Sequence, residues 1–247
     1  MIELPPGVCH VWELHRSIVD DGPDLHHACL KELPADELER HARFRFPKKR
    51  NEFLLGKLMT RRILSFYHER APLDWQFREG VRGKPEALDC GDLRFNLSHT
   101  NGLLALALVR GAEIGVDVEL IEPRDAAVAE RFFAPEEVEA VRAAPPRLRD
   151  RLFARFWTLK ESYIKAHGDG LSIPLASFRF LLEEPVRIAF RDGGDPAEWW
   201  FTHREPPGGE HALAVAVHTR GPMRAEIRYL STHEATIPLS RALHPTK

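Results

Sequence analysis

The stretch IGVDVEL, residues 114–120, combines the pattern of a buried strand with two carboxylates. Its four aliphatic residues fall on one face of a strand, while Asp117 and Glu119 fall on the other. An ordinary amphipathic strand explains this alternation, and so does a pair of acids held together to bind a ligand. Gly115, within the strand, indicates a place where another backbone or a ligand comes close.

The sequence before this strand predicts an antiparallel meander. Two apolar runs, LRFNLS (93–98) and LLALALV (103–109), flank an Asn-Gly pair at 101–102. Asn-Gly between apolar runs is the strongest short hairpin signal. EIGVDVEL follows a second turn at 110–111, so the two acids are expected on the third strand of the meander.

Apolar residues at helical spacing predict three helical regions, and a capping residue predicts a shorter helix. A weak internal repeat accompanies them, since ARFRF…FLLGKLMTRRIL and AERFF…RFWTLKESYIK both run from an Arg-Phe pair to a long helix. The repeat hints at a duplicated α+β unit. The expected elements are a strand at Val8–Leu14, a helix capped by Asp36, a helix from Asn51, a helical region with Pro135 at its first position, a helix from about Arg149 to Ala166 ending at Gly168, and four strands in the C-terminal third.

The composition excludes several classes of protein. The 247 residues are 43% hydrophobic and 29% charged with a net charge of −2, so the chain is typical of a globular protein and is not broadly attracted to nucleic acid or anionic membranes. The longest apolar run is too short to span a bilayer, and the N-terminus lacks the features of a secretion signal. Three widely spaced cysteines without a CxxC motif indicate a reducing compartment. We expect a cytoplasmic protein.

Basic residues are concentrated between residues 40 and 62. This block holds nine Lys or Arg residues and one acid, Glu52. Such a block is most often a solvated face, and it can also bind a polyanionic ligand. Composition does not decide between the two.

The predicted long helix carries a second set of charged residues. Glu161 and Lys165 are one turn apart, and in isolation they indicate a surface ion pair that contributes roughly 0.3–0.5 kcal/mol. Trp157 and Ile164 are interleaved with these charges and with Lys160, although a solvated face does not need large apolar side chains. The mixture indicates either a ligand wall or a second packing surface.

Two carboxylates on a strand and a third on a helix would suit Mg²⁺. This ion prefers oxygen ligands and often completes its shell with phosphate oxygens, whose charge nearby lysines would balance. Ser98 and His99 lie at a strand end, and Lys84 lies on the turn RGKP, where each could reach a ligand. A structural histidine and an ordinary surface turn remain the simpler interpretations of these last features.

In this order along the chain, RGKP, FNLSHT, GVDVE and WTLKESYIKA resemble the motifs of the 4′-phosphopantetheinyl transferase superfamily, and the length resembles its Sfp type. The resemblance covers about residues 40–180. It implies an α+β fold of two pseudo-twofold-related α+β halves, 1–111 and 112–247. Each half would have a small antiparallel sheet and a long packing helix, with the active site between them.

The resemblance also implies an enzyme that moves the 4′-phosphopantetheine of coenzyme A onto a serine of an apo acyl or peptidyl carrier protein and releases adenosine 3′,5′-bisphosphate. Asp117, Glu119 and Glu161 would hold Mg²⁺. Glu161, directly or through a water on the metal, would take the serine proton. A monomer is expected, with neither nucleic acid nor membrane as a partner.

The remaining implied contacts concern coenzyme A and the carrier. Those to coenzyme A would come from Lys165, Lys160, Ser98, His99, Lys84 and, for the 3′-phosphate, Arg50, with Lys48 and Lys49 as alternatives. The segment from about Pro123 to Val141 would dock the carrier protein.

Two other functions are compatible with the residues alone. The same acids could serve another Mg²⁺-dependent nucleotidyl or phosphodiester transferase, which would act on nucleotides without a carrier protein. A non-catalytic protein could instead bind nucleotide or RNA through the basic block, although no recognisable RNA-binding module is present.

Overall fold

The computed structural model describes residues 1–15, 29–80, 83–168, 173–191, 193–219 and 225–231. Strands and helices are mixed along the described chain. The elements are β1 (Val8–His15), α2 (Ala35–Arg43), α3 (Pro47–Tyr67), η2 (Pro72–Asp74), β2 (Phe77–Glu79), β3 (Pro85–Ala87), β4 (Leu93–Thr100), β5 (Leu103–Arg110), β6 (Glu113–Leu120), α4 (Ala126–Phe132), α5 (Pro135–Ala143), α6 (Pro146–His167), η5 (Leu175–Ser177), β7 (Phe178–Leu181), β8 (Arg187–Phe190), η6 (Pro196–Glu198), β9 (Trp199–Arg204), β10 (His211–His218) and β11 (Glu226–Ser231).

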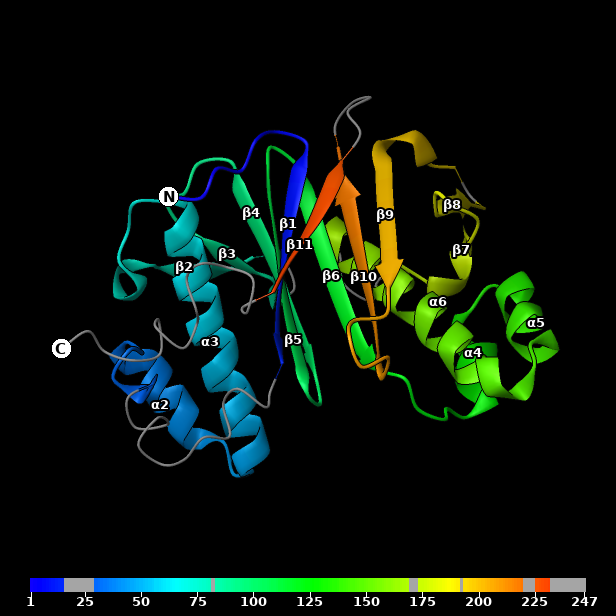
Figure 1. The fold of residues 1–247 in the computed structure, drawn as a ribbon, viewed down its shortest axis with the longest axis horizontal. Helices are drawn as coiled ribbons and strands as arrows, with labels where there is room; N and C mark the ends of the chain where they lie inside the picture. Colours follow the sequence, from blue (N-terminus) through cyan, green and yellow to red (C-terminus); the bar gives the residue numbers. More distant parts are fainter. Residues whose placement is uncertain (16–28, 81–82, 169–172, 192, 220–224, 232–247) are drawn as a thin grey trace.

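Two sheets lie side by side between the two long helices (Figure 1). The first sheet has the strand order β11-β1-β5-β4, and the second has the order β6-β10-β9. Helix α3 covers the outer face of the first sheet, where Trp12, Met59 and Leu106 share one core cluster. Helix α6 covers the second sheet, where Leu159 and Ala214 belong to another. The expected α+β fold, with a small sheet and a long helix in each half, is confirmed.

The inner faces of the two sheets pack against each other. Val11 of β1, Val116 of β6 and Val215 of β10 belong to one buried aliphatic cluster. An ion pair between Glu13 of β1, which is buried, and Arg204 of β9 also joins the sheets. The aliphatic face predicted for residues 114–120 is therefore the face that holds the two halves together.

Side chains of β4 complete the outer edge of β6. The backbone N–H of Val116 donates to Asn96 Oδ1 at 2.9 Å, and that of Val118 donates to Ser98 Oγ at 3.3 Å. Because β6 is the edge strand of its sheet, these backbone groups would otherwise lack a neighbouring strand. The halves are thus joined at the strand that carries Asp117.

The predicted meander is correct for its first two strands and wrong for the third. β4 and β5 form the expected hairpin, with Thr100 opposite Leu103. β6 does not continue that sheet; it pairs with β10, so that Asp117 lies opposite Ala214. After the turn at Gly111, whose φ is 68°, the aliphatic face of β6 packs onto the first sheet instead of extending it.

β11 was not predicted from the sequence. It pairs in parallel with β1, with Val8 opposite Glu226, so the first sheet is mixed rather than purely antiparallel. The expected boundary at residues 111–112 lies between the two sheets, but the chain after it returns to the first sheet through β11. Ile227 and Tyr229 of β11 pack on the inner cluster. Two alternating apolar residues are too few to indicate a strand from the sequence.

The helix limits differ from the prediction mainly at their starts. Helices α3 and α6 begin at prolines, Pro47 and Pro146, earlier than apolar spacing indicated. Pro34, not Asp36, is the N-cap of α2, and Asp36 lies in its first turn. Gly168 ends α6 in the left-handed conformation, as expected, with φ of 82°. Within the described residues, no helix is both long and apolar enough to cross a membrane.

Candidate active site

Gly115 allows helix α6 to lie directly on strand β6. A Cβ at this position would be 2.0 Å from the carbonyl oxygen of Ser162 and 2.4 Å from the backbone nitrogen of Ala166. The predicted close approach of another backbone is confirmed, and that backbone is α6. Asp117 lies two residues further along the same face, so it is held against the helix.

Asp117 is the centre of the site. Its side chain is buried at the junction of β4, β6 and α6. Oδ1 accepts hydrogen bonds from Ser98 Oγ at 3.0 Å and from Lys165 Nζ at 2.5 Å. Oδ2 is also buried, and no donor within the described residues lies within hydrogen-bond distance of it. One carboxylate oxygen is therefore anchored, while the other is buried without a hydrogen-bond partner among the described residues.

Ser98 fixes the geometry around Asp117. Its hydroxyl donates to Asp117, accepts from the backbone N–H of Val118 at 3.3 Å, and lies 3.0 Å from Lys165 Nζ. The structure therefore brings Ser98 together with Asp117 and Lys165, and its contact to coenzyme A stays a prediction. Its contacts here are to the carboxylate and the lysine that surround the site.

Glu119 and Glu161 extend the carboxylate cluster. Burial raises the pKa of both carboxyls, and repulsion from Asp117 raises each further. Burial also raises the pKa of Asp117, against the opposing effect of Lys165 and the Ser98 hydrogen bond. The pKa of Glu161 is in addition raised by Glu119. The three acids that the sequence predicted to cooperate are thus close enough to oppose one another's ionisation.

The carboxylate cluster has the ligand types of a hard-cation site, but its side chains are not arranged as a complete coordination group. No three His, Cys, Asp or Glu side chains in the described part of the chain already form a group that could hold a metal ion. The ligand atoms are nevertheless of the right kind, because Mg²⁺ prefers carboxylate oxygens. Among the described residues, no group donates a hydrogen bond to Asp117 Oδ2. The residues present fit a divalent cation that keeps several water or phosphate ligands.

The structure contradicts the predicted role of Lys160 as a phosphate contact. Its side chain is fully buried, and its ammonium donates to the carbonyl oxygens of Leu175 and Phe178, each at 2.8 Å. It also pairs with Glu137 at 2.8 Å. At about 100° per residue, Lys160 and Lys165 point about 140° apart around α6. Only Lys165 faces Asp117.

His99 and Lys84 lie near the cluster but contact different surfaces. His99 lines a mostly apolar cavity of about 140 Å³ with Phe53 and Pro85. Desolvation lowers the pKa of His99, with Glu52 opposing this effect. Lys84 donates to the carbonyl of Ile114 at 3.0 Å, and burial lowers its pKa. Lys84 also lines a polar cavity of about 570 Å³.

Much of the basic block is neutralised by acids. Arg61 donates to Glu37 at 3.0 Å and to two backbone carbonyls, so it is a buried structural contact. Arg50 donates to the carbonyl of Phe44 at 2.8 Å, and none of its hydrogen-bond partners belongs to the Asp117 cluster. Acids therefore balance most of the positive charges of this block. The other acid partners found here are Glu39 for Arg43, Glu79 for Arg40, Glu52 for Lys49, Glu37 for Lys57 and Glu32 for Arg62.

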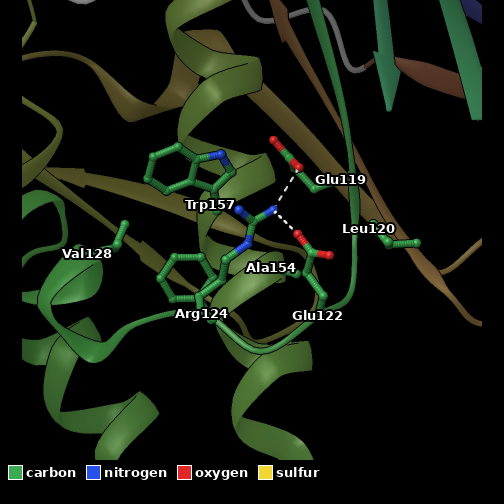
Figure 2. A pocket seen from close by; sticks show the side chains of 8 residues that line it. Glu119, Leu120, Glu122, Arg124, Val128, Ala154 and Trp157 are labelled. Carbon is green, nitrogen blue, oxygen red and sulfur yellow. Dashed lines mark hydrogen bonds and ion pairs between the residues drawn. The ribbon is translucent and has the colours of Figure 1, made fainter. Parts of the chain in front are cut away.

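A cavity of about 110 Å³ adjoins the carboxylate cluster on its other side. Figure 2 shows Arg124 between Glu119 and Glu122, with Trp157 and Val128 facing the same space. Arg124 Nη2 lies 3.4 Å from Glu119 and 3.0 Å from Glu122. Trp157 is therefore both a cavity wall and a packing residue, because its indole also stacks on Phe153 at 5.9 Å.

Sequence reasoning missed two residues that shape the site. Asn96 accepts a hydrogen bond from the backbone of β6. In the sequence FNLS, Asn96 and Ser98 lie on the same face of their strand, and this alternation could have identified Asn96. Arg124 pairs with Glu119 across a loop, and no periodic pattern marks such a contact.

Comparisons with known proteins show the family of this chain. A family model described as the 4′-phosphopantetheinyl transferase superfamily matches residues 113–216, which include β6 and α6. The 4′-phosphopantetheinyl transferase psf-1 of Bacillus pumilus is 34% identical over 189 residues, with 74% of this chain and 77% of the relative covered. The chain belongs to the 4′-phosphopantetheinyl transferase superfamily.

Two further transferases of the superfamily show how far the similarity reaches. The 4′-phosphopantetheinyl transferase Sfp of Bacillus subtilis is 30% identical over 186 residues, covering 74% of this chain and 82% of the relative. HetI of a Nostoc species is 39% identical over 145 residues, and the match covers 57% of this chain and 61% of HetI. The predicted resemblance to Sfp-type transferases is confirmed, and the chain is an enzyme of this superfamily.

Proposed function

We propose that this enzyme transfers 4′-phosphopantetheine from coenzyme A to a serine hydroxyl of an apo carrier protein, with Mg²⁺ as cofactor. The observation that carries the proposal is the buried Asp117 beside Glu119 and Glu161. Its Oδ1 is held by Ser98 and Lys165, and its Oδ2 has no hydrogen-bond partner among the described residues. The serine oxygen would bond to the phosphorus that bears the pantetheine arm, and the bond to adenosine 3′,5′-bisphosphate would break.

Asp117, Glu119 and Glu161 would hold the cation. When bound, Mg²⁺ would polarise the attacked phosphorus and offset the negative charge on the leaving bisphosphate. Ser98 would keep the Asp117 carboxylate in a fixed orientation by its hydrogen bond to Oδ1. This orientation leaves Oδ2 for the ligand.

Lys165 would neutralise phosphate oxygens. Its ammonium is partly exposed and already lies next to Asp117, so it can reach both the carboxylate cluster and a phosphate beside it. Glu161 would take the proton of the carrier serine, directly or through a water. Its raised pKa suits this task, because a base with a pKa nearer the working pH accepts a proton more effectively.

The cavities beside the carboxylate cluster suggest where coenzyme A would bind. Lys84 and His99 are on the side of the cluster towards α3 and the β2–β3 hairpin, where they would meet the phosphates and the adenylate end. Arg50 remains a proposed partner of the 3′-phosphate.

The carrier protein would approach beside α4 and α5. Val128 of α4 lines the cavity next to Glu119, so this helix borders the place where the serine must arrive. The proposed docking segment, Pro123–Val141, covers α4, most of α5 and the loop before them. We propose that the enzyme acts as a monomer, because the two halves of one chain enclose the whole carboxylate cluster. We also propose that it is cytoplasmic.

Protons and Mg²⁺ should compete for the cluster. Burial raises the pKa of Asp117, Glu119 and Glu161, so these carboxyls retain protons at higher pH than ordinary carboxyls, which titrate near pH 4. Mg²⁺ needs them ionised. The apparent Mg²⁺ affinity should therefore fall as pH is lowered, beginning at a higher pH than for a site of ordinary carboxyls. Titrating Mg²⁺ against the transfer rate at several pH values measures this, and an affinity that does not change with pH would contradict it.

The proposed function is tested by incubating the protein with coenzyme A, Mg²⁺ and a panel of apo carrier proteins, and reading each carrier by intact mass. We expect a phosphopantetheine adduct on the carrier serine, and none when the metal is chelated or the serine is replaced by alanine. The absence of an adduct on every carrier would refute the proposal. Turnover of nucleotides without a carrier would support the other Mg²⁺-dependent transferase instead.

A further inference from the structure

Lys160 and Glu137 form an ion pair that is buried from solvent. Lys160 is 0% exposed and Glu137 is 2% exposed, and their charged groups are 2.8 Å apart. All three hydrogens of the ammonium have acceptors, since it also donates to the carbonyls of Leu175 and Phe178. A charge so fully enclosed cannot contact phosphate.

Glu137 extends the connection to further elements. Its Oε2 accepts from the backbone N–H of Ala134 at 2.9 Å, at the start of α5. Its Oε1 accepts from the backbone N–H of Phe180 in β7 at 2.8 Å. The pair therefore joins α6, the start of α5, η5 and β7 through five hydrogen bonds. Removing either charge would leave the other buried without its partner.

The elements that this pair joins border the carboxylate cluster. Glu161, the residue after Lys160, belongs to the cluster. Phe133, just before the start of α5, packs on Trp157 at a ring distance of 6.4 Å, and Trp157 lines the same cavity as Glu119 and Val128 (Figure 2). The hairpin of α4 and α5 thus lies beside the cluster, and the ion pair fixes its second helix to α6.

We propose that Lys160 and Glu137 are positioning residues that set the affinity for the carrier protein by holding the α4–α5 hairpin in place. The inference rests on the proposed function. The coenzyme contacts proposed for Lys84 and His99 come from the β3 and β4 side of the molecule, which the ion pair does not touch. The pair should therefore act on the carrier and not on coenzyme A.

Glu137→Gln tests this with little change of shape. The amide cannot accept both backbone N–H groups through its two terminal atoms, and it leaves the Lys160 ammonium unbalanced. We expect the KM for the apo carrier to rise on the order of ten-fold, with the KM for coenzyme A and kcat unchanged within about two-fold. A double variant, Lys160→Met with Glu137→Gln, removes both charges. It should melt at a higher temperature than Lys160→Met alone and keep the raised carrier KM.

Glu13→Gln is the matched control. It also removes the charge of a buried glutamate, whose partner Arg204 is partly exposed, but it lies between the two sheets and away from the hairpin. It should lower thermal stability without changing either KM. If Glu137→Gln raises both KM values, changes neither, or acts like Glu13→Gln, the pair is only structural and the proposal is wrong.

Amide hydrogen exchange tests the hairpin independently of activity. In Glu137→Gln, the amides of residues 126–143 should exchange faster while those of β6 and β10 stay protected. Unchanged exchange in the hairpin would overturn the inference even if transfer occurs. Failure of the proposed function itself would look different, because the wild-type enzyme would then form no adduct on any carrier.

Discussion

Glu161→Gln is expected to reduce transfer by roughly a thousand-fold or more while leaving the fold intact. The change removes a proposed cation ligand and the proposed base together, but it keeps the size and most of the polarity of the side chain. Intact-mass measurement of the carrier at saturating coenzyme A and Mg²⁺ reports the loss, and circular dichroism reports the fold.

The stability of this variant provides a second readout with a defined sign. Burial raises the pKa of Glu161 in the folded chain, so its ionised form is less favourable there than in the unfolded chain. A group of this kind contributes stability at low pH and loses it as pH rises through the folded pKa. Glu161→Gln should therefore melt at the same or a higher temperature than the wild type at neutral pH, with the difference shrinking towards about pH 4.

Glu183→Gln is a suitable comparison for Glu161→Gln, because Glu183 is exposed in the bend between β7 and β8 and pairs with Arg187 at the start of β8. It should transfer and melt like the wild type. If Glu161→Gln is unfolded, or if it transfers normally, Glu161 belongs to the core or to an unrelated surface and not to the active site.

Gly115→Ala is expected to destabilise the protein by about 3 kcal/mol or more and to abolish transfer with it. The added methyl group would meet the backbone of α6 at Ser162 and Ala166, at distances that no rotamer change can relieve. Either β6 and α6 separate, which removes Lys165 from Asp117, or the fold is lost. Urea unfolding, read by fluorescence and by circular dichroism, gives the free energy.

Gly56→Ala is the matched control for Gly115→Ala. Its Cβ would meet only the end of the Leu97 side chain, at 3.0 Å, and alanine favours the surrounding helix α3. A side chain can move where a backbone cannot, so this variant should lose much less stability. Equal effects of the two variants would show that the contact between β6 and α6 is not as tight as the structure indicates.

Periodicity in the sequence was enough to predict the elements that carry the site. Alternation in IGVDVEL correctly separated the aliphatic face, which packs between the sheets, from the face of Asp117, which meets α6. The expectation that Gly115 allows a close approach is also confirmed. These features depend on local geometry, which a strand imposes wherever it lies.

What the sequence could not predict depends on contacts between distant elements. Lys160 and Lys165 are both lysines near Glu161, and the contacts of Lys160 with Glu137 and two distant carbonyls show that it is buried. The pairing of β6 with β10, and of β11 with β1, joins segments far apart in the chain, for which neighbouring turns give no signal. The pairing of Lys57 and Arg61 with Glu37, and of Arg62 with Glu32, was hidden for the same reason.

The proposed function depends most directly on whether the cluster around Asp117 binds a divalent cation together with coenzyme A. Mn²⁺ can replace Mg²⁺ at such an oxygen site and can be followed by electron paramagnetic resonance. We predict that, with coenzyme A present, the wild-type protein binds one Mn²⁺ per chain and that Asp117→Asn, shown to be folded, does not. Equal Mn²⁺ binding by the two proteins would contradict the account.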